Sequence, residues 1–101
     1  MAKHFDLTSI LSNEKPTITI GEHTFTVNDE KTNVILMNKG MEGLTPIEAA
    51  EFAVERLLGK DQKTTLDSFK LSMTSYFEIF YALVACVNNE EIETVKERFQ
   101  K

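Results

Sequence analysis

The segment that most restricts the fold is a short alternation of apolar residues and threonines around one glycine. Apolar residues and threonines alternate on both sides of Gly21, which is followed by a glutamate. This pattern predicts a β-hairpin over about residues 16–27, with Gly21 at the first position of a type II′ turn. Ile18 is expected to pair with Phe25, which gives the hairpin one apolar face. Because two strands alone are marginally stable in water, that face must be covered by helices.

Helical patterns fill most of the remaining chain. The sharpest helix start is Thr45-Pro46-Ile47-Glu48, where a threonine N-cap, a proline at the first helical position and a glutamate at the third form a capping box. A short helix or turn is also expected over residues 7–11, behind Asp6. The predicted helices cover about residues 31–40, 46–58, 61–70, 73–88 and 90–100.

Chain length limits how these elements can be organised. With 101 residues, a second independent core would leave too few residues for either core. The expected fold is mainly α, of the α+β class: a small helical bundle with an N-terminal two-stranded antiparallel β-hairpin. We expect one domain over residues 1–101.

Charge restricts the partners. The formal net charge is −5 and the lysines are scattered singly, so phosphate backbones and anionic lipid surfaces would be repelled. The longest apolar run, Tyr76 to Val87, has about twelve residues, where roughly twenty are needed to span a bilayer. Neither nucleic acid nor a membrane is therefore an expected partner. The lone Cys86 lies in that run and is expected to pack in the core, and with no export signal the chain is expected in a cytoplasm.

Residues that could carry catalysis are few. His4 and His23 stand apart, with no cysteine near either in sequence, which is unlike the paired ligands of a zinc site. The two glycines of Gly40-Met41-Glu42-Gly43 are explained by a helix C-cap followed by a turn. No nucleotide-binding, hydrolase or metalloprotease motif is present. We therefore expect no catalytic residue, no metal and no cofactor, and a protein that is not an enzyme.

Methionine and aromatic side chains remain as candidates for binding another protein. Methionine adapts to irregular partners and aromatic residues anchor interfaces. Phe77 and Phe80 are assigned to the core. The candidate partner-binding residues are Met37, Met41, Met73 and Tyr81. If exposed, they would form an apolar patch suited to a client protein or to a homo-oligomer.

Short stretches spread over almost the whole chain occur in one order: Phe5-Asp6-Leu7, Lys15-Pro16, the hairpin Ile18–Asp29, Lys31-Thr32-Asn33-Val34, Leu57-Leu58-Gly59-Lys60 and Val87-Asn88-Asn89-Glu90-Glu91. In this order they resemble the tail assembly chaperones of Gram-positive siphophages and prophages. The likeness rests on element order and short similar stretches, with no chemical signature.

This resemblance implies a protein made in the cytoplasm of the infected bacterial host. Such a chaperone binds the long hydrophobic tape measure protein and keeps it soluble while tail tube subunits polymerise around it. The family offers no catalytic residue. It is commonly made in two forms, the longer by ribosomal frameshifting, and this chain looks like the short form.

Two other functions are open at this point. The first is a structural virion protein of the head-tail connector or tail completion type, which would share the size and the acidity. The second is a small enzyme or regulator whose site assembles only in the fold, for example around His23 with two carboxylates.

Overall fold

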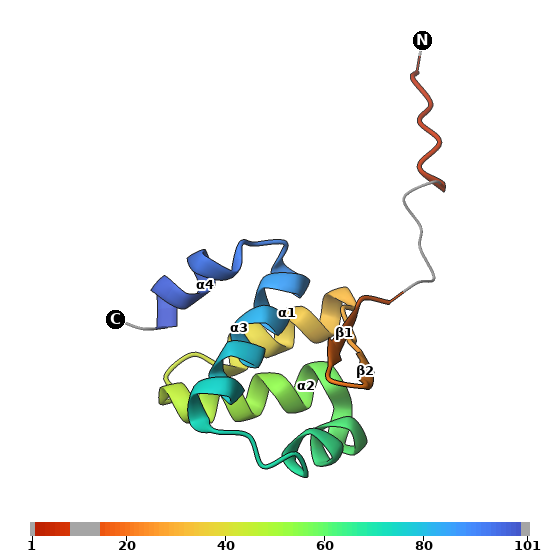
Figure 1. Cartoon of the computed structure of the whole chain (residues 1–101). Helices are drawn as coiled ribbons and strands as arrows, with labels where there is room; N and C mark the ends of the chain where they lie inside the picture. Colours follow the sequence, from red (N-terminus) through yellow and green to blue (C-terminus); the bar gives the residue numbers. More distant parts are fainter. Residues whose placement is uncertain (1, 9–14, 100–101) are drawn as a thin grey trace.

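The computed structural model describes residues 2–8 and 15–99. Its described elements are strands β1 (Thr17–Ile20) and β2 (His23–Thr26) and helices α1 (Lys31–Gly40), α2 (Pro46–Asp67), α3 (Met73–Asn88) and α4 (Ile92–Phe99) (Figure 1). The predicted fold class is confirmed, because the chain is mainly helical with an N-terminal antiparallel hairpin. The helix expected over residues 7–11 falls largely outside the described residues. The assignment of residues 1–101 to one domain stays a prediction.

The hairpin has the predicted register. Ile18 pairs with Phe25, and Gly21 has a φ of +62° while Glu22 does not have a positive φ, as a type II′ turn requires. Phe25 is buried. Gln62 of α2 holds the hairpin from the side, since its amide oxygen accepts from Thr26 N at 3.0 Å and its Nε2 donates to Thr26 O at 2.7 Å. The apolar face is therefore packed on helices, as two isolated strands require.

Helices α1 and α2 are antiparallel neighbours that meet at a glycine. A Cβ on Gly40 would clash with the ring of Phe52, so the missing side chain lets this ring pass close to α1. The prediction that Gly40 caps α1 was wrong: the C-cap is Met41, in a right-handed conformation. The turn expected at Gly43 is present, with a φ of +80°. The close approach of Phe52 therefore explains why residue 40 is a glycine, and sequence spacing does not reveal such a contact.

Helix α2 starts at the predicted capping box and bends sharply inside. Thr45 Oγ1 accepts from Glu48 N at 3.3 Å, and Glu48 Oε1 accepts from Thr45 N at 3.1 Å. Gly59 has a φ of 82° and a ψ of 162°, which separates a first half (46–58) from a second half (60–67). The predicted break at Gly59 is therefore real. The second half ends at Asp67, earlier than predicted, and Lys70 follows in the left-handed region.

Helix α3 packs on both α2 and α4. It has the predicted bounds, and it ends where Asn89 adopts a left-handed conformation. Phe80 has 0% exposure, and its ring contacts those of Phe77, Tyr81 and Phe99. The assignment of Phe77 and Phe80 to the core is confirmed, with Phe77 partly buried.

One side of α3 faces outward. Glu78 and Cys86 are exposed on it, so the prediction of a core cysteine was wrong. Partial burial of the sulfur, and then the nearby Asp29 carboxylate, raise the pKa of the Cys86 thiol. Helix α4 begins at Ile92, two residues later than predicted, and Glu90, which lies before it, pairs with Arg98.

Candidate partner-binding groove

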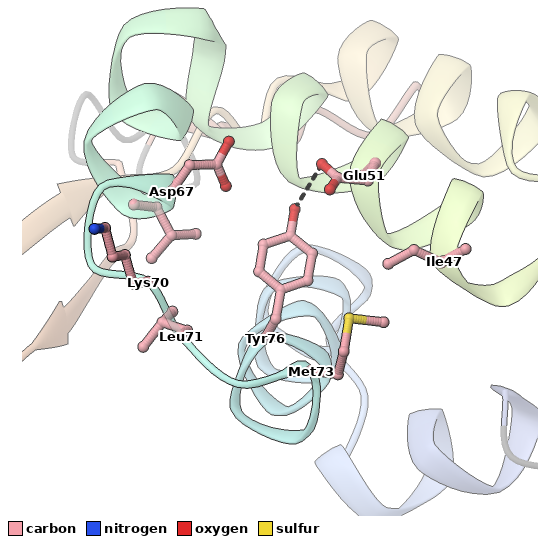
Figure 2. A pocket seen from close by; sticks show the side chains of 8 residues that line it. Ile47, Glu51, Asp67, Lys70, Leu71, Met73 and Tyr76 are labelled. Atoms are coloured by element: carbon pink, nitrogen blue, oxygen red, sulfur yellow. Dashed lines mark hydrogen bonds between the residues drawn. The ribbon is translucent and has the colours of Figure 1, made fainter.

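A groove opens where the second half of α2 and the following loop meet the start of α3. Its cavity measures about 170 Å³ and is lined by Ile47, Glu51, Leu66, Asp67, Lys70, Leu71, Met73 and Tyr76 (Figure 2). An apolar cavity of about 150 Å³ holds a benzene molecule. The groove is therefore the right size for one aromatic or branched side chain of another molecule.

One side of the groove mouth is apolar and accessible. Met73 is 57% exposed and Ile47 is 37% exposed, whereas Leu66 beneath them is fully buried. Both exposed residues lie in the first turn of a helix, α3 and α2 respectively. Side chains tilt toward the helix N-terminus, so at the first turn they extend past the end of the helix and have no preceding turn to cover. The apolar side of the mouth is thus formed by two helix starts.

A hydrogen-bonded network forms the polar wall of the groove. The Tyr76 hydroxyl donates to Glu51 Oε2 at 3.1 Å. Lys63 Nζ lies 2.6 Å from the same Glu51 oxygen and 3.0 Å from Asp67 Oδ2. Figure 2 shows Tyr76 pointing toward Glu51, with Met73 and Ile47 to one side and Asp67 and Leu71 to the other. The network joins both halves of α2 to α3, so it fixes the shape of the groove across the bend at Gly59.

The network is held in one protonation state near neutral pH. Burial, and then the Glu51 carboxylate, raise the pKa of the Tyr76 hydroxyl above its ordinary value. Partial burial lowers the pKa of Lys63, but hydrogen bonds to Glu51 and Asp67 outweigh this and raise it. The phenol remains neutral and the ammonium remains charged, so their hydrogen bonds to the carboxylates persist.

Alkaline pH is expected to destabilise the fold through this network. A folded-state pKa above the unfolded value of about 10 for Tyr76 provides stability that is complete below about pH 10 and is lost as pH rises toward the folded pKa. Lys63 acts in the same direction, because its pKa is raised too. Urea unfolding of the wild type and of Tyr76→Phe between about pH 7 and 11 tests this. The variant should lose less stability at high pH, and identical pH profiles would contradict the assignment.

The groove offers binding contacts and no obvious reaction chemistry. Within residues 2–8 and 15–99, no group of three or more His, Cys, Asp or Glu side chains is placed to hold a metal ion. His23 is exposed on the hairpin, and its ring centroid lies 5.0 Å from that of Phe69 and 6.2 Å from that of Phe25. This histidine therefore has a packing role at the edge of the sheet. The two groove carboxylates are already engaged by Lys63 and Tyr76.

The four predicted partner-binding residues lie in different places. Met37 and Tyr81 are buried in the core, so they are not available to a partner in this fold. Met41 is partly buried at a second cavity of about 210 Å³, together with Asn38, Glu42, Arg98 and Phe99. Met73 alone lines the groove. The structure does not gather the four into one surface, because α1 directs Met37 inward and α3 directs Tyr81 toward its neighbours.

Of the eight residues that line the groove, sequence reasoning named only Met73 as a candidate for binding a partner. The spacing of Ile47 with Ala50, Val54 and Leu57 predicts a side chain on the buried side of α2, but Ile47 is exposed at the mouth. Leu71 lies in the loop after α2 and carries no periodic signal. The position of Ile47 directly after Pro46, in the first helical turn, is the signal that could have placed it at the surface.

No family model, curated protein or solved structure matches this chain. None of the helices over the described residues is long and apolar enough to cross a membrane.

Proposed function

We propose that this chain is a tail assembly chaperone of a long-tailed phage or prophage, acting in the cytoplasm of the bacterial host. It would bind the tape measure protein and keep it soluble while the tail tube protein polymerises. The observation that carries the proposal is the groove with Met73 at its mouth. The resemblance supplies the identity of the client.

The groove fits the task of a chaperone because it provides a modest, reversible contact. One apolar client side chain buried there contributes about 1.5–3 kcal/mol. Met73 is unbranched and flexible, so it can adapt to client side chains of different shape. The net charge of −5 makes copies of the chaperone repel one another in solution. Because this contact is weak, the client can be released from the chaperone once the tail tube forms.

Co-expression with the tape measure protein of the same phage tests the proposal. We expect the wild-type chain to keep the tape measure protein in the soluble fraction and to co-purify with it. Met73→Lys should reduce the co-purified amount by about 10- to 100-fold, since it places a charge where an apolar side chain should be buried. Because Met73 is exposed, this variant is expected to fold normally.

The matched control is Ile92→Lys, which introduces the same charge at a residue 44% exposed in the first turn of α4. It should co-purify like the wild type, and circular dichroism should show both variants folded. A tape measure protein that stays insoluble with the wild-type chain would contradict the chaperone function. Stoichiometric amounts of the chain in purified virions would instead favour a head-tail connector or tail completion protein.

A further inference from the structure

The outward face of α1 combines two exposed apolar residues with two lysines. Lys31, Ile35 and Lys39 follow one another at intervals of four residues and form one ridge along the helix. Thr32 and Leu36 form the adjacent ridge. All five residues are exposed, and Ile35 and Leu36 are 43% and 44% exposed. We call these five residues the α1 face.

The charge of this face is opposite to that of the molecule. Helix α1 contains two lysines and no carboxylate, whereas the whole chain has a net charge of −5. Among the ion pairs of the described residues, Lys63, Lys96 and Arg98 supply the cations, and neither lysine of the α1 face takes part. The two ammonium groups are therefore free to pair with another molecule.

The apolar pair has no packing role inside the domain. Helix α1 faces the core through Met37, on its opposite side. Single exposed apolar side chains are ordinary on protein surfaces. Here two of them are neighbours and lie between cations, which is the arrangement of an amphipathic docking face.

We propose that the α1 face binds an acidic amphipathic helix of a partner protein. The proposal rests on the proposed function, in that the chain acts by binding proteins, and it names the chemistry of a client segment other than the one held in the groove. Lys31 and Lys39 are separated by about 12 Å along the helix axis. The partner should therefore carry carboxylates seven or eight residues apart, with apolar residues between them that pack on Ile35 and Leu36.

Charge argues against a second copy of this chain and against nucleic acid as the molecule that binds the α1 face. A second copy docked through the same face would place lysines against lysines, which is repulsive. Nucleic acid would meet two lysines surrounded by an acidic molecule, and its phosphates would be repelled by the rest of the surface. A short protein helix with a few carboxylates can instead bind within the α1 face and avoid contact with the acidic remainder of the surface.

Synthetic helical peptides of about 20 residues test this with the full-length protein. The first peptide has leucines flanked by glutamates at the spacing above, the second has lysines in place of the glutamates, and the third has alanines in place of the leucines. Backbone amide resonances followed during titration locate the binding site. We expect saturable binding of the first peptide only, with the largest changes at residues 31–39.

Variants of the protein separate the contribution of the apolar side chains to peptide binding from that of the lysines. Leu36→Lys and the charge reversal Lys31→Glu/Lys39→Glu should each weaken binding of the acidic peptide by about tenfold or more. The control Lys15→Glu/Lys60→Glu changes the net charge equally at exposed residues outside α1 and should weaken binding less. Ile92→Lys, equal to Leu36 in exposure, should bind like the wild type. Exposed substitutions of this kind are expected to leave the fold intact.

Three results would overturn the inference: equal binding of acidic and basic peptides, full binding by Lys31→Glu/Lys39→Glu, or binding of a DNA duplex that depends on the same lysines. Co-expression distinguishes its failure from that of the proposed function. A tape measure protein that stays insoluble while the acidic peptide binds α1 contradicts the function alone. A tape measure protein solubilised equally by the wild type and by Lys31→Glu/Lys39→Glu, with no peptide binding, contradicts the α1 inference alone.

Discussion

Replacing Phe80 by alanine is expected to lower the free energy of unfolding by about 3–5 kcal/mol. Phe80 has no exposed surface and its ring contacts three other aromatic rings, including that of Phe99, 5.0 Å away between centroids. The substitution removes these contacts and leaves a cavity between α3 and α4. A domain of this size has a total stability of about 5–15 kcal/mol, so the variant should be largely or partly unfolded at physiological temperature.

Urea unfolding followed by circular dichroism measures this loss, with Phe77→Ala as the control. Phe77 is the same residue type, one turn earlier on α3, but it is only partly buried. It should therefore lose clearly less stability. Phe80→Leu keeps much of the side-chain volume, so its free energy of unfolding should lie between those of the wild type and Phe80→Ala. Equal losses at both phenylalanines would contradict the placement of the core around Phe80.

Gly59→Ala is expected to lower the free energy of unfolding by about 1–3 kcal/mol and to weaken the groove. The φ of 82° and ψ of 162° at Gly59 lie in a region that only glycine adopts readily. A Cβ there would meet no atom within 4 Å, so the cost comes from the backbone alone. An alanine that relaxed the bend would move Lys63 and Leu66 away from the first half of α2, and binding to the tape measure protein should fall with it.

Gly43→Ala is the control for backbone strain without an effect on the groove. Gly43 also has a positive φ, of +80°, and open space around it, but it lies in the turn before α2. This variant should lose stability and keep client binding. Unfolding curves together with co-purification of the tape measure protein compare the two. Full binding and full stability in Gly59→Ala would show that the bend is not needed.

Local signals explain what the sequence predicted well. The hairpin register follows from the threonine alternation around Gly21, and the start of α2 follows from Thr45 and Glu48, whose hydrogen bonds lie within one turn. The break at Gly59 was also predicted from a single residue. These features depend on neighbours in the chain, which the sequence displays directly.

Features that depend on distant neighbours were not predictable in this way. Gly40 was interpreted as a cap because its contact with Phe52 exists only after α1 packs on α2. Cys86 was placed in the core because a run of residues that is apolar except for Glu78 does not show how far one side of α3 stays uncovered. Met37 and Met73 are chemically alike, yet one is buried and the other exposed. Residue type predicted adaptable side chains, and packing decided which of them a partner can reach.

The lysines of α1 would also affect how fast the proposed acidic partner arrives. A positive helix on an acidic molecule gives the protein an electric dipole moment. An approaching acidic segment is attracted toward α1 and repelled from other faces before any contact is made, over a distance of about 8 Å at physiological ionic strength. Added salt should therefore slow association while leaving the lifetime of the bound complex nearly unchanged. Such steering would select the orientation of the proposed partner during diffusion.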